Sequence, residues 1–247
     1  MITETTKSFN EIISKIPNNY NVLDVGGAMG PTARANYIID YISYDNISLN
    51  QAKGGGPVHF SKQNYIQHDI CSRKGWPFQD KQFDYSICSH VLEDIRDPIW
   101  VCSEIIRVSR AGYIEVPSRI YESSFCIEAK KTAGASHHRW FVELIDGKLA
   151  FTFKNFYIHY KFLNKIKCKK AKDNYLRIEW SDDFYFYENW LNSGKEMFEY
   201  ILGKKINDKE KWNIVRKIGC HSYLIGWLKY LKNTNKLIEK IFNKFIK

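Results

Sequence analysis

The sequence predicts an α/β fold built on a doubly wound, mostly parallel sheet. Apolar runs of strand type alternate with stretches of helical spacing through residues 20–117, and this alternation indicates parallel strands joined by right-handed crossovers. The first run, residues 22–25, ends in a glycine-rich turn at 26–30. Two later runs end in carboxylates, at Asp45 and Asp69. Because such sheets bind ligands at the carboxyl ends of their strands, we expect the site there.

Composition and charge narrow the class of protein. The 247 residues are 44% hydrophobic and 15% aromatic, which is typical of a globular chain with a full core. No membrane span or secretory signal is visible, and six scattered cysteines without a CxxC pair favour reduced thiols, so we expect a cytoplasmic protein. Of the net charge of +10, residues 204–247 carry most, with 12 Lys and Arg against three Asp and Glu. The nearly neutral main body makes nucleic acid an unlikely partner there.

The predicted elements follow from apolar spacing and from turn residues. Helical spacing indicates helices at 4–16, 31–38 and 97–108. Apolar runs indicate strands at 22–25, 41–45, 65–70, 83–88 and 111–116. Less regular patterns later in the chain indicate strands at 149–154, 156–162 and 175–180, and helices at 183–203, 207–218 and 221–247. The consecutive glycines within 51–63 exclude a regular helix there.

The glycine-rich turn has the chemistry of a nucleotide-binding corner. The chain must turn sharply from strand to helix, and its backbone must approach a ligand without a Cβ in the way. Asp45 follows Asp24 by 21 positions, close to the offset of about 20 residues at which an acidic side chain meets a cofactor ribose. Any strand-to-helix corner can use glycine, so the turn alone does not identify the ligand. An NAD site is disfavoured because Ala28 and Met29 interrupt the Gly-x-Gly-x-x-Gly pattern.

Taken in order, these features resemble class I S-adenosylmethionine-dependent methyltransferases of the small-molecule type, which include the ubiquinone-biosynthesis enzymes. The resemblance covers about residues 20–117 and is carried by 22–30, Asp45, 68–70, 77–84, 89–93 and 104–108. The chain departs from the family pattern at Ala28, where the middle glycine is usual, and at Asp94, where a histidine is common. The chain also lacks the long helix that usually follows the position of Asp45 in the family, so the segment that would cover the cofactor differs from the family pattern.

The resemblance implies a Rossmann-like, seven-stranded sheet that binds S-adenosylmethionine. It implies that the turn holds the amino-acid end, Asp45 the ribose hydroxyls and Asp69 the adenine amine. Carboxylates suit the last two tasks because they accept hydrogen bonds from hydroxyls and amines. The implied cofactor-binding residues are Asp24, Gly26, Gly27, Ala28, Gly30, Asp45, Asn46, Asp69, Ile70, Ser89 and His90. A degenerate, noncatalytic methyltransferase-like interaction module is the alternative.

We expect one domain over residues 1–247. Its parts are a cofactor half at 1–117, a substrate insertion after the fifth strand at 118–148, remaining strands and helices at 149–220, and a helical C-terminal extension at 221–247.

The insertion holds the candidate catalytic residues. Histidines titrate near neutrality, so His137 or His138 could act as a general base, and Arg139 or Arg119 could hold an anionic group. Because adjacent residues of a strand point to opposite faces, we expect only one of the two histidines to reach the acceptor. The alternative is a pair of half-buried histidines beside a core Trp140. No carboxylate at metal-ligand spacing accompanies them, so we predict no metal site.

The insertion and the Lys/Asn/Ile-rich composition loosely resemble methyltransferases of bacterial surface-polysaccharide and capsule gene clusters. This resemblance implies O-methylation of a polar small molecule, such as a glycan precursor or its phosphate or phosphoramidate group. An RNA methyltransferase that uses the basic tail is the alternative enzyme.

The basic tail has an amphipathic pattern, with an apolar stripe through residues 237–246 and lysines elsewhere. It can pack on the domain, pack on a second copy in a homodimer, or lie on an anionic membrane at the inner face of the cell. RNA contact is disfavoured, because no aromatic stacking motif accompanies the lysines.

Overall fold

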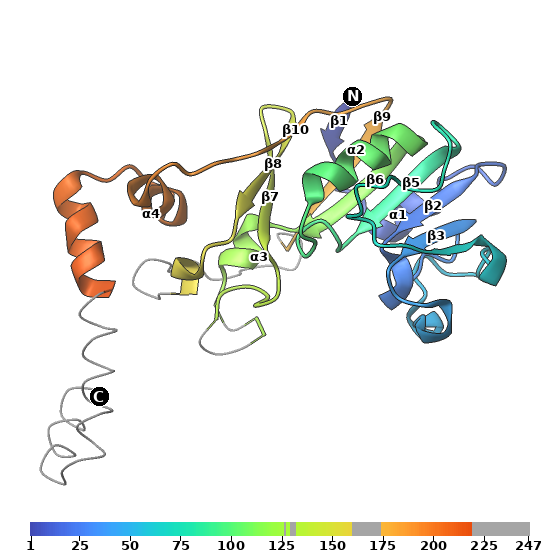
Figure 1. Ribbon diagram of the computed structural model, residues 1–247, viewed down its shortest axis with the longest axis horizontal. Helices are drawn as coiled ribbons and strands as arrows, with labels where there is room; N and C mark the ends of the chain where they lie inside the picture. The colour runs from blue at the N-terminus through green and yellow to red at the C-terminus, as the bar shows by residue number, and fades with distance from the viewer. Residues whose placement is uncertain (126, 129–131, 160–173, 219–247) are drawn as a thin grey trace, which may run out of the picture. The chain divides into compact units, whose positions relative to one another are not determined.

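A computed structural model describes residues 1–125, 127–128, 132–159 and 174–218 (Figure 1). The chain divides into two compact units, Met1–Trp190 and Leu191–Lys247. The second unit contains α4 (Gly194–Leu202) and a helical stretch at 208–218. The helix expected over 221–247 lies outside the described residues. Within the part of the chain that is described, no helix is long and apolar enough to cross a membrane.

Seven strands of the described residues form the central sheet, in the order β1-β9-β6-β5-β2-β3-β4. They are β1 (Ile2–Glu4), β2 (Val22–Val25), β3 (Tyr37–Asp40), β4 (Tyr65–Gln67), β5 (Phe83–Ser89), β6 (Ser109–Pro117) and β9 (Tyr175–Ser181). Five neighbouring strands run parallel to one another, namely β6, β5, β2, β3 and β4, whereas β9 runs antiparallel to both β6 and β1. The sheet confirms the predicted Rossmann-like α/β class.

The N-terminus differs from the helix expected at 4–16. Residues Ile2–Glu4 form the edge strand β1 beside β9, and the helix α1 covers only Phe9–Ile13. Ser8 caps this helix, because its hydroxyl accepts from the Glu11 amide while the Glu11 carboxylate accepts from the Ser8 amide. This capping box fixes the start of the helix at Phe9 and leaves the preceding residues free to pair with the sheet.

The connection from β2 to β3 also differs from prediction. The helix expected at 31–38 and the strand expected at 41–45 are both wrong, because β3 already occupies Tyr37–Asp40. After β2 the chain makes a single 3₁₀ turn, η1 (Gly27–Met29). Residues 31–33 then pair with Lys53 instead of forming helical hydrogen bonds, since the Lys53 amide donates to the Pro31 carbonyl and the Ala33 amide donates to the Lys53 carbonyl. The carboxylate at the end of this strand is therefore Asp40.

A second sheet has the order β10-β8-β7 among the described residues, and Figure 1 shows β7 and β8 beside a short helix. It consists of β7 (Trp140–Ile145), β8 (Lys148–Phe153) and β10 (Phe186–Glu188). The strand expected at 156–162 is a 3₁₀ turn, η5 (Phe156–His159), as far as the described residues extend. The helix expected at 183–203 is replaced by β10 and α4. A short helix α3 (Arg119–Ser123) opens the insertion.

Helices cover the two faces of the central sheet. Adjacent residues of β2 enter different clusters: Leu23 packs with the cluster that contains α2 (Pro98–Val108), and Val22 packs with the cluster that contains α1. Because adjacent residues of a strand point to opposite faces, the two helices lie on opposite sides of the sheet. Among the described residues, Cys71, Cys88 and Cys102 are buried and carry free thiols.

Gly112 of β6 provides a test of this packing. A Cβ at this position would lie 2.5 Å from the Ser86 carbonyl oxygen and 2.7 Å from the Trp180 indole nitrogen. We expect Gly112→Ala to lower the free energy of unfolding by about 1–3 kcal/mol, because the neighbouring strands must shift to admit the methyl group. Gly194→Ala, at a position with nothing within 4 Å, is the matched control and should not lower the free energy of unfolding. Equal urea midpoints for the two variants would contradict the packing.

Candidate active site

A cavity of about 720 Å³ lies at the carboxyl ends of β2, β3, β4 and β5. Its lining comes from Asp40 at the end of β3, from the loops that follow the four strands, and from Arg139, which directly precedes β7. The lining residues are Gly26, Met29, Asp40, Tyr41, Ile42, Asp69, Ile70, Cys71, His90, Val91, Asp94, Ile95, Arg96 and Arg139. This is the edge of the sheet at which the sequence predicted a ligand.

Glycine is required at two positions of the turn after β2. Gly26 has a left-handed φ of 73°, and a Cβ there would lie 2.6 Å from a methyl group of Val91. A Cβ on Gly27 would overlap the carboxylate of Asp24. Asp24 is buried and accepts a hydrogen bond of 2.7 Å from the Thr32 amide, and burial raises its pKa to about 6. Asp24 therefore shapes the turn, whose Gly26 lines the cavity.

Asp40 joins the turn to the end of β3. One carboxylate oxygen accepts from the Ala28 amide at 2.9 Å, and the other accepts from the Ile42 amide at 2.8 Å. A carboxylate has about four acceptor positions, so Asp40 keeps capacity for a ligand in the cavity. Asp40 was not among the predicted site residues, although the apolar run at 37–39 directly before it is typical of a strand that ends in a carboxylate.

Asp45 lies outside the set of described residues that line the cavity. Its side chain is 77% exposed and pairs with Lys62 at 3.1 Å, in the short turn η2 (Tyr44–Asn46). Asn46 is also outside that set and donates to the Ser43 hydroxyl. The expected position of Asp45 at a strand end is therefore wrong, because the strand that should carry it ends five residues earlier.

Asp69 follows β4 and lines the cavity as expected, together with Ile70. The Arg96 guanidinium donates to one carboxylate oxygen at 2.6 Å, and the Cys71 amide donates to the other at 3.0 Å. The hydrogen bond from Arg96 is the main reason that the pKa of Asp69 is lowered. Asp69 is thus a carboxylate near neutral pH, next to an apolar stretch formed by Ile42, Ile70 and Val91.

His90 lies between two glutamates at the cavity. Its backbone has a left-handed φ of 59°, and its ring nitrogens lie 3.4 Å from Glu93 and 3.4 Å from Glu115. Burial lowers the pKa of His90, but hydrogen bonds and charge interactions with Glu115 and Glu93 outweigh it and raise the pKa to about 9. His90 therefore carries a positive charge at the cavity near neutral pH. Ser89, also expected here, makes a long hydrogen bond of 3.5 Å to Glu115.

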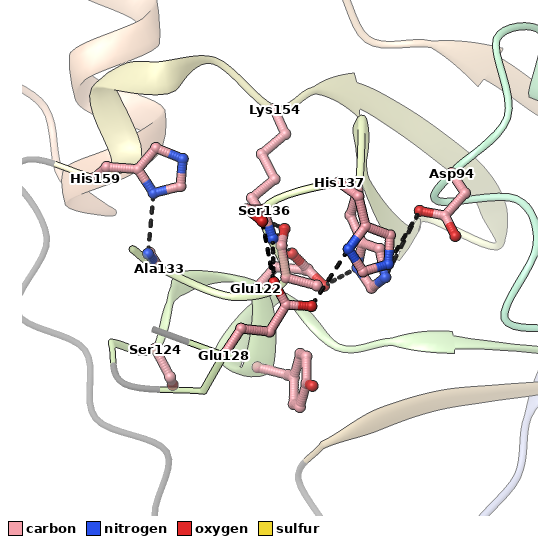
Figure 2. A network of polar contacts seen from close by, with 12 residues as sticks. Asp94, Glu122, Ser124, Glu128, Ala133, Ser136, His137, Lys154 and His159 are labelled. Atoms are coloured by element: carbon pink, nitrogen blue, oxygen red, sulfur yellow. Dashed lines mark hydrogen bonds and ion pairs between the residues drawn. The ribbon is translucent and has the colours of Figure 1, made fainter. Parts of the chain in front are cut away.

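His138 is held by a buried ion pair. Its Nδ1 lies 2.5 Å from one oxygen of Glu122. The other oxygen of Glu122 accepts from the Lys154 ammonium, and both of these residues are buried. Figure 2 shows Lys154 extending toward Glu122. Lys154 also donates to the Ala135 carbonyl at 2.7 Å. Gly134 allows this arrangement, because a Cβ at that position would lie 2.5 Å from the Glu122 carboxylate. The insertion is therefore built around one charged pair that orients the histidine.

His137 and His138 both turn toward Asp94. Their Nε2 atoms lie 3.9 Å and 3.7 Å from the same oxygen of Asp94, and their rings meet edge to face at 4.5 Å. The expectation that they point to opposite faces of a strand is wrong, because β7 begins only at Trp140. Asp94 supplies a carboxylate that local sequence spacing did not reveal.

The two candidate arginines lie in different places. Arg139 lines the cavity, and its backbone amide donates to the carbonyl of Glu93, the residue before Asp94. Arg119 lines a separate cavity of about 370 Å³, where it pairs with Glu143 at 3.3 Å and lies over the ring of Phe141. The structure thus gathers His137, His138 and Arg139 near Asp94 and places Arg119 elsewhere.

Residues 23–114 match a family model described as a methyltransferase domain. The matched stretch includes every cavity-lining residue except Arg139, and the match supports S-adenosylmethionine as the cofactor. No curated protein matches the sequence at a significant level.

Solved structures that resemble part of this chain include S-adenosylmethionine-dependent methyltransferases from two bacteria. That from Mesorhizobium loti is 14% identical, with 60% of this chain and 63% of that chain covered and a TM-score of 0.34. That from Aquifex aeolicus is 18% identical, with 44% and 64% covered and a TM-score of 0.30. The [4+2]-cyclase SpnF is 17% identical, with 44% of each chain covered and a TM-score of 0.33. The chain spans about half the length of SpnF and of two further solved structures.

The position of His90 predicts how stability depends on pH. A raised pKa means that folding favours the protonated ring, so this contribution is complete below the ordinary pKa of 6.5 and is lost as the pH rises toward 9. We expect His90→Gln to be less stable than the parent by at least about 1 kcal/mol at about pH 6, allowing for solvent screening, with a smaller difference above about pH 9. Urea unfolding at both values measures this. A difference that is constant or grows with pH would contradict the charged assignment.

Proposed function

We propose that this chain is an S-adenosylmethionine-dependent methyltransferase that methylates an oxygen of a polar small molecule. The observation that carries the proposal is the position of Asp40 and Asp69 on one cavity, beside the glycine turn of the matched domain. The Asp94, His137 and His138 cluster lies next to that cavity and supplies the acceptor side.

The residues of the cavity fit the cofactor. Gly26 lets the backbone approach the amino-acid end, because it has no side chain and adopts a left-handed φ. Asp40 accepts hydrogen bonds from the ribose hydroxyls, a task that the sequence had assigned to Asp45, and Asp69 accepts from the adenine amine. Ile70 and Val91 give the adenine ring an apolar wall. When bound, S-adenosylmethionine supplies an electrophilic methyl group.

The acceptor is best placed near Arg139. The Arg139 side chain is exposed at the cavity, and among the described residues it has no ion-pair partner. A guanidinium in that state suits a phosphate or carboxylate. The neighbouring cluster of Asp94 and the two histidines promotes loss of the acceptor's proton, which an oxygen acceptor requires. A surface-glycan precursor, or its phosphate or phosphoramidate derivative, has both the hydroxyls and the charge that these residues match.

Cofactor binding tests the proposal. Titration calorimetry of the full chain with S-adenosylmethionine should give a one-site isotherm. Asp40→Asn should weaken binding by at least about tenfold, because it removes charge-assisted hydrogen bonds worth about 1.5–3 kcal/mol. Circular dichroism checks that this variant is folded.

Asp45→Asn is the matched control, since it makes the same change five residues along the chain and outside the cavity lining. It should bind like the parent. Absence of binding by the parent chain would refute the function, and a loss of affinity in Asp45→Asn alone would return the ribose contact to Asp45.

A further inference from the structure

We propose that Asp94, His137 and His138 form a three-ligand site for a divalent transition-metal ion such as Zn²⁺. One ligand atom from each residue lies within 4.8 Å of the others. Metal binding follows from these residues alone, whereas its use in activating an acceptor rests on the proposed function.

The distances need only a small adjustment to match a metal ion. The Asp94 oxygen lies 3.9 Å from His137 Nε2 and 3.7 Å from His138 Nε2. A tetrahedral ion with bonds of about 2.0–2.1 Å holds its ligand atoms about 3.3 Å apart. Side-chain movements of about half an ångström would therefore bring the Asp94 oxygen to this distance from each Nε2 atom, and all three ligand atoms already lie within 4.8 Å of one another.

Asp94 lacks the partner that its position requires. The oxygen that faces both histidines is buried and has no hydrogen-bond partner among the described residues. The nearest ring nitrogen, on His138, is 3.7 Å away and too distant for a hydrogen bond. Buried carboxylate oxygens are normally satisfied, because an unpaired one keeps its full desolvation cost. A cation bound between this oxygen and the two Nε2 atoms would supply the missing interaction.

Each histidine has a carboxylate on its other nitrogen. Glu122 lies 2.5 Å from His138 Nδ1, and Glu128 lies 3.3 Å from His137 Nδ1. Figure 2 shows Glu128 on the side of His137 opposite Asp94. Glu128 is itself fixed by the amide and hydroxyl of Ser136, at 2.8 Å and 3.1 Å. Metal-binding histidines characteristically donate the second N–H to a carboxylate, which leaves the Nε2 lone pair for the ion.

The ligand types select the class of metal. Two imidazoles and one carboxylate suit Zn²⁺, Fe²⁺, Co²⁺ or Ni²⁺, whereas Mg²⁺ and Ca²⁺ prefer oxygen ligands alone. Three protein ligands leave a coordination position for a water or substrate oxygen. Because Asp94 also lines the cofactor cavity, the ion would lie at the cavity wall. If the proposed function holds, an acceptor hydroxyl bound there would lose its proton more readily.

Zn²⁺ titration of the chelator-treated full chain tests the site. Calorimetry should show one Zn²⁺ per chain that depends on the three ligands, and His137→Ala, His138→Ala and Asp94→Asn should each weaken it at least tenfold. Glu128→Gln should weaken it about tenfold, because it alters only the carboxylate behind His137. Co²⁺ should give visible absorption bands with the parent chain, and these bands should be lost in the three ligand variants.

His59→Ala is the matched control, because His59 is an exposed histidine away from the cluster, and it should bind Zn²⁺ like the parent. If His138→Ala does not fold, the Zn²⁺ affinities of the His137→Ala and Asp94→Asn variants test the site, because these two side chains are more exposed. A parent chain that binds no Zn²⁺, or ligand variants that bind it like the parent, would overturn the proposal. An S-adenosylmethionine isotherm on the same samples separates the two claims, since it fails only if the proposed function fails.

Discussion

The hydrogen bond from the Ala28 amide to the Asp40 carboxylate is the contact on which the cofactor side of the structure depends. It ties the turn after β2 to the end of β3, and the 3₁₀ turn η1 is the one helical element in this described stretch. The same turn is also shaped by Asp24, which accepts a hydrogen bond from the Thr32 amide, and by Gly26, which has a left-handed φ. Together these residues fix a backbone and a carboxylate at one edge of the sheet, and this edge is where a nucleoside can be held.

The proposed acceptor side depends on a different interaction, the buried pair of Glu122 and Lys154. Removing two charges from water is costly, and the cost is tolerated when each charge is fully bonded. Glu122 is bonded to Lys154 and His138, and Lys154 also reaches the Ala135 carbonyl. The pair orients His138 toward Asp94, which belongs to the loop after β5 and lines the cofactor cavity. The insertion and the sheet therefore meet at Asp94.

Local sequence signals predicted part of this arrangement. β2, β5, α2 and β6 were correctly predicted, because their apolar runs and the Asp97-Pro98 start of α2 act over a few residues. Asp40 was missed because residues 31–33 pair with Lys53, twenty positions away, and a helix pattern cannot show this. β1 was missed because its partner β9 lies at the other end of the unit. The meeting of Asp94 with the two histidines is likewise a tertiary contact, so residue spacing could not reveal it.

A crystal structure of the full chain with S-adenosylhomocysteine tests the central claim most directly. We expect the ribose hydroxyls to lie within about 3 Å of the Asp40 carboxylate, with the adenine beside Asp69 and Ile70. We also expect the thioether sulfur to point toward Arg139 and Asp94. A nucleoside bound against Asp45, or outside the cavity at the ends of β2–β5, would contradict it.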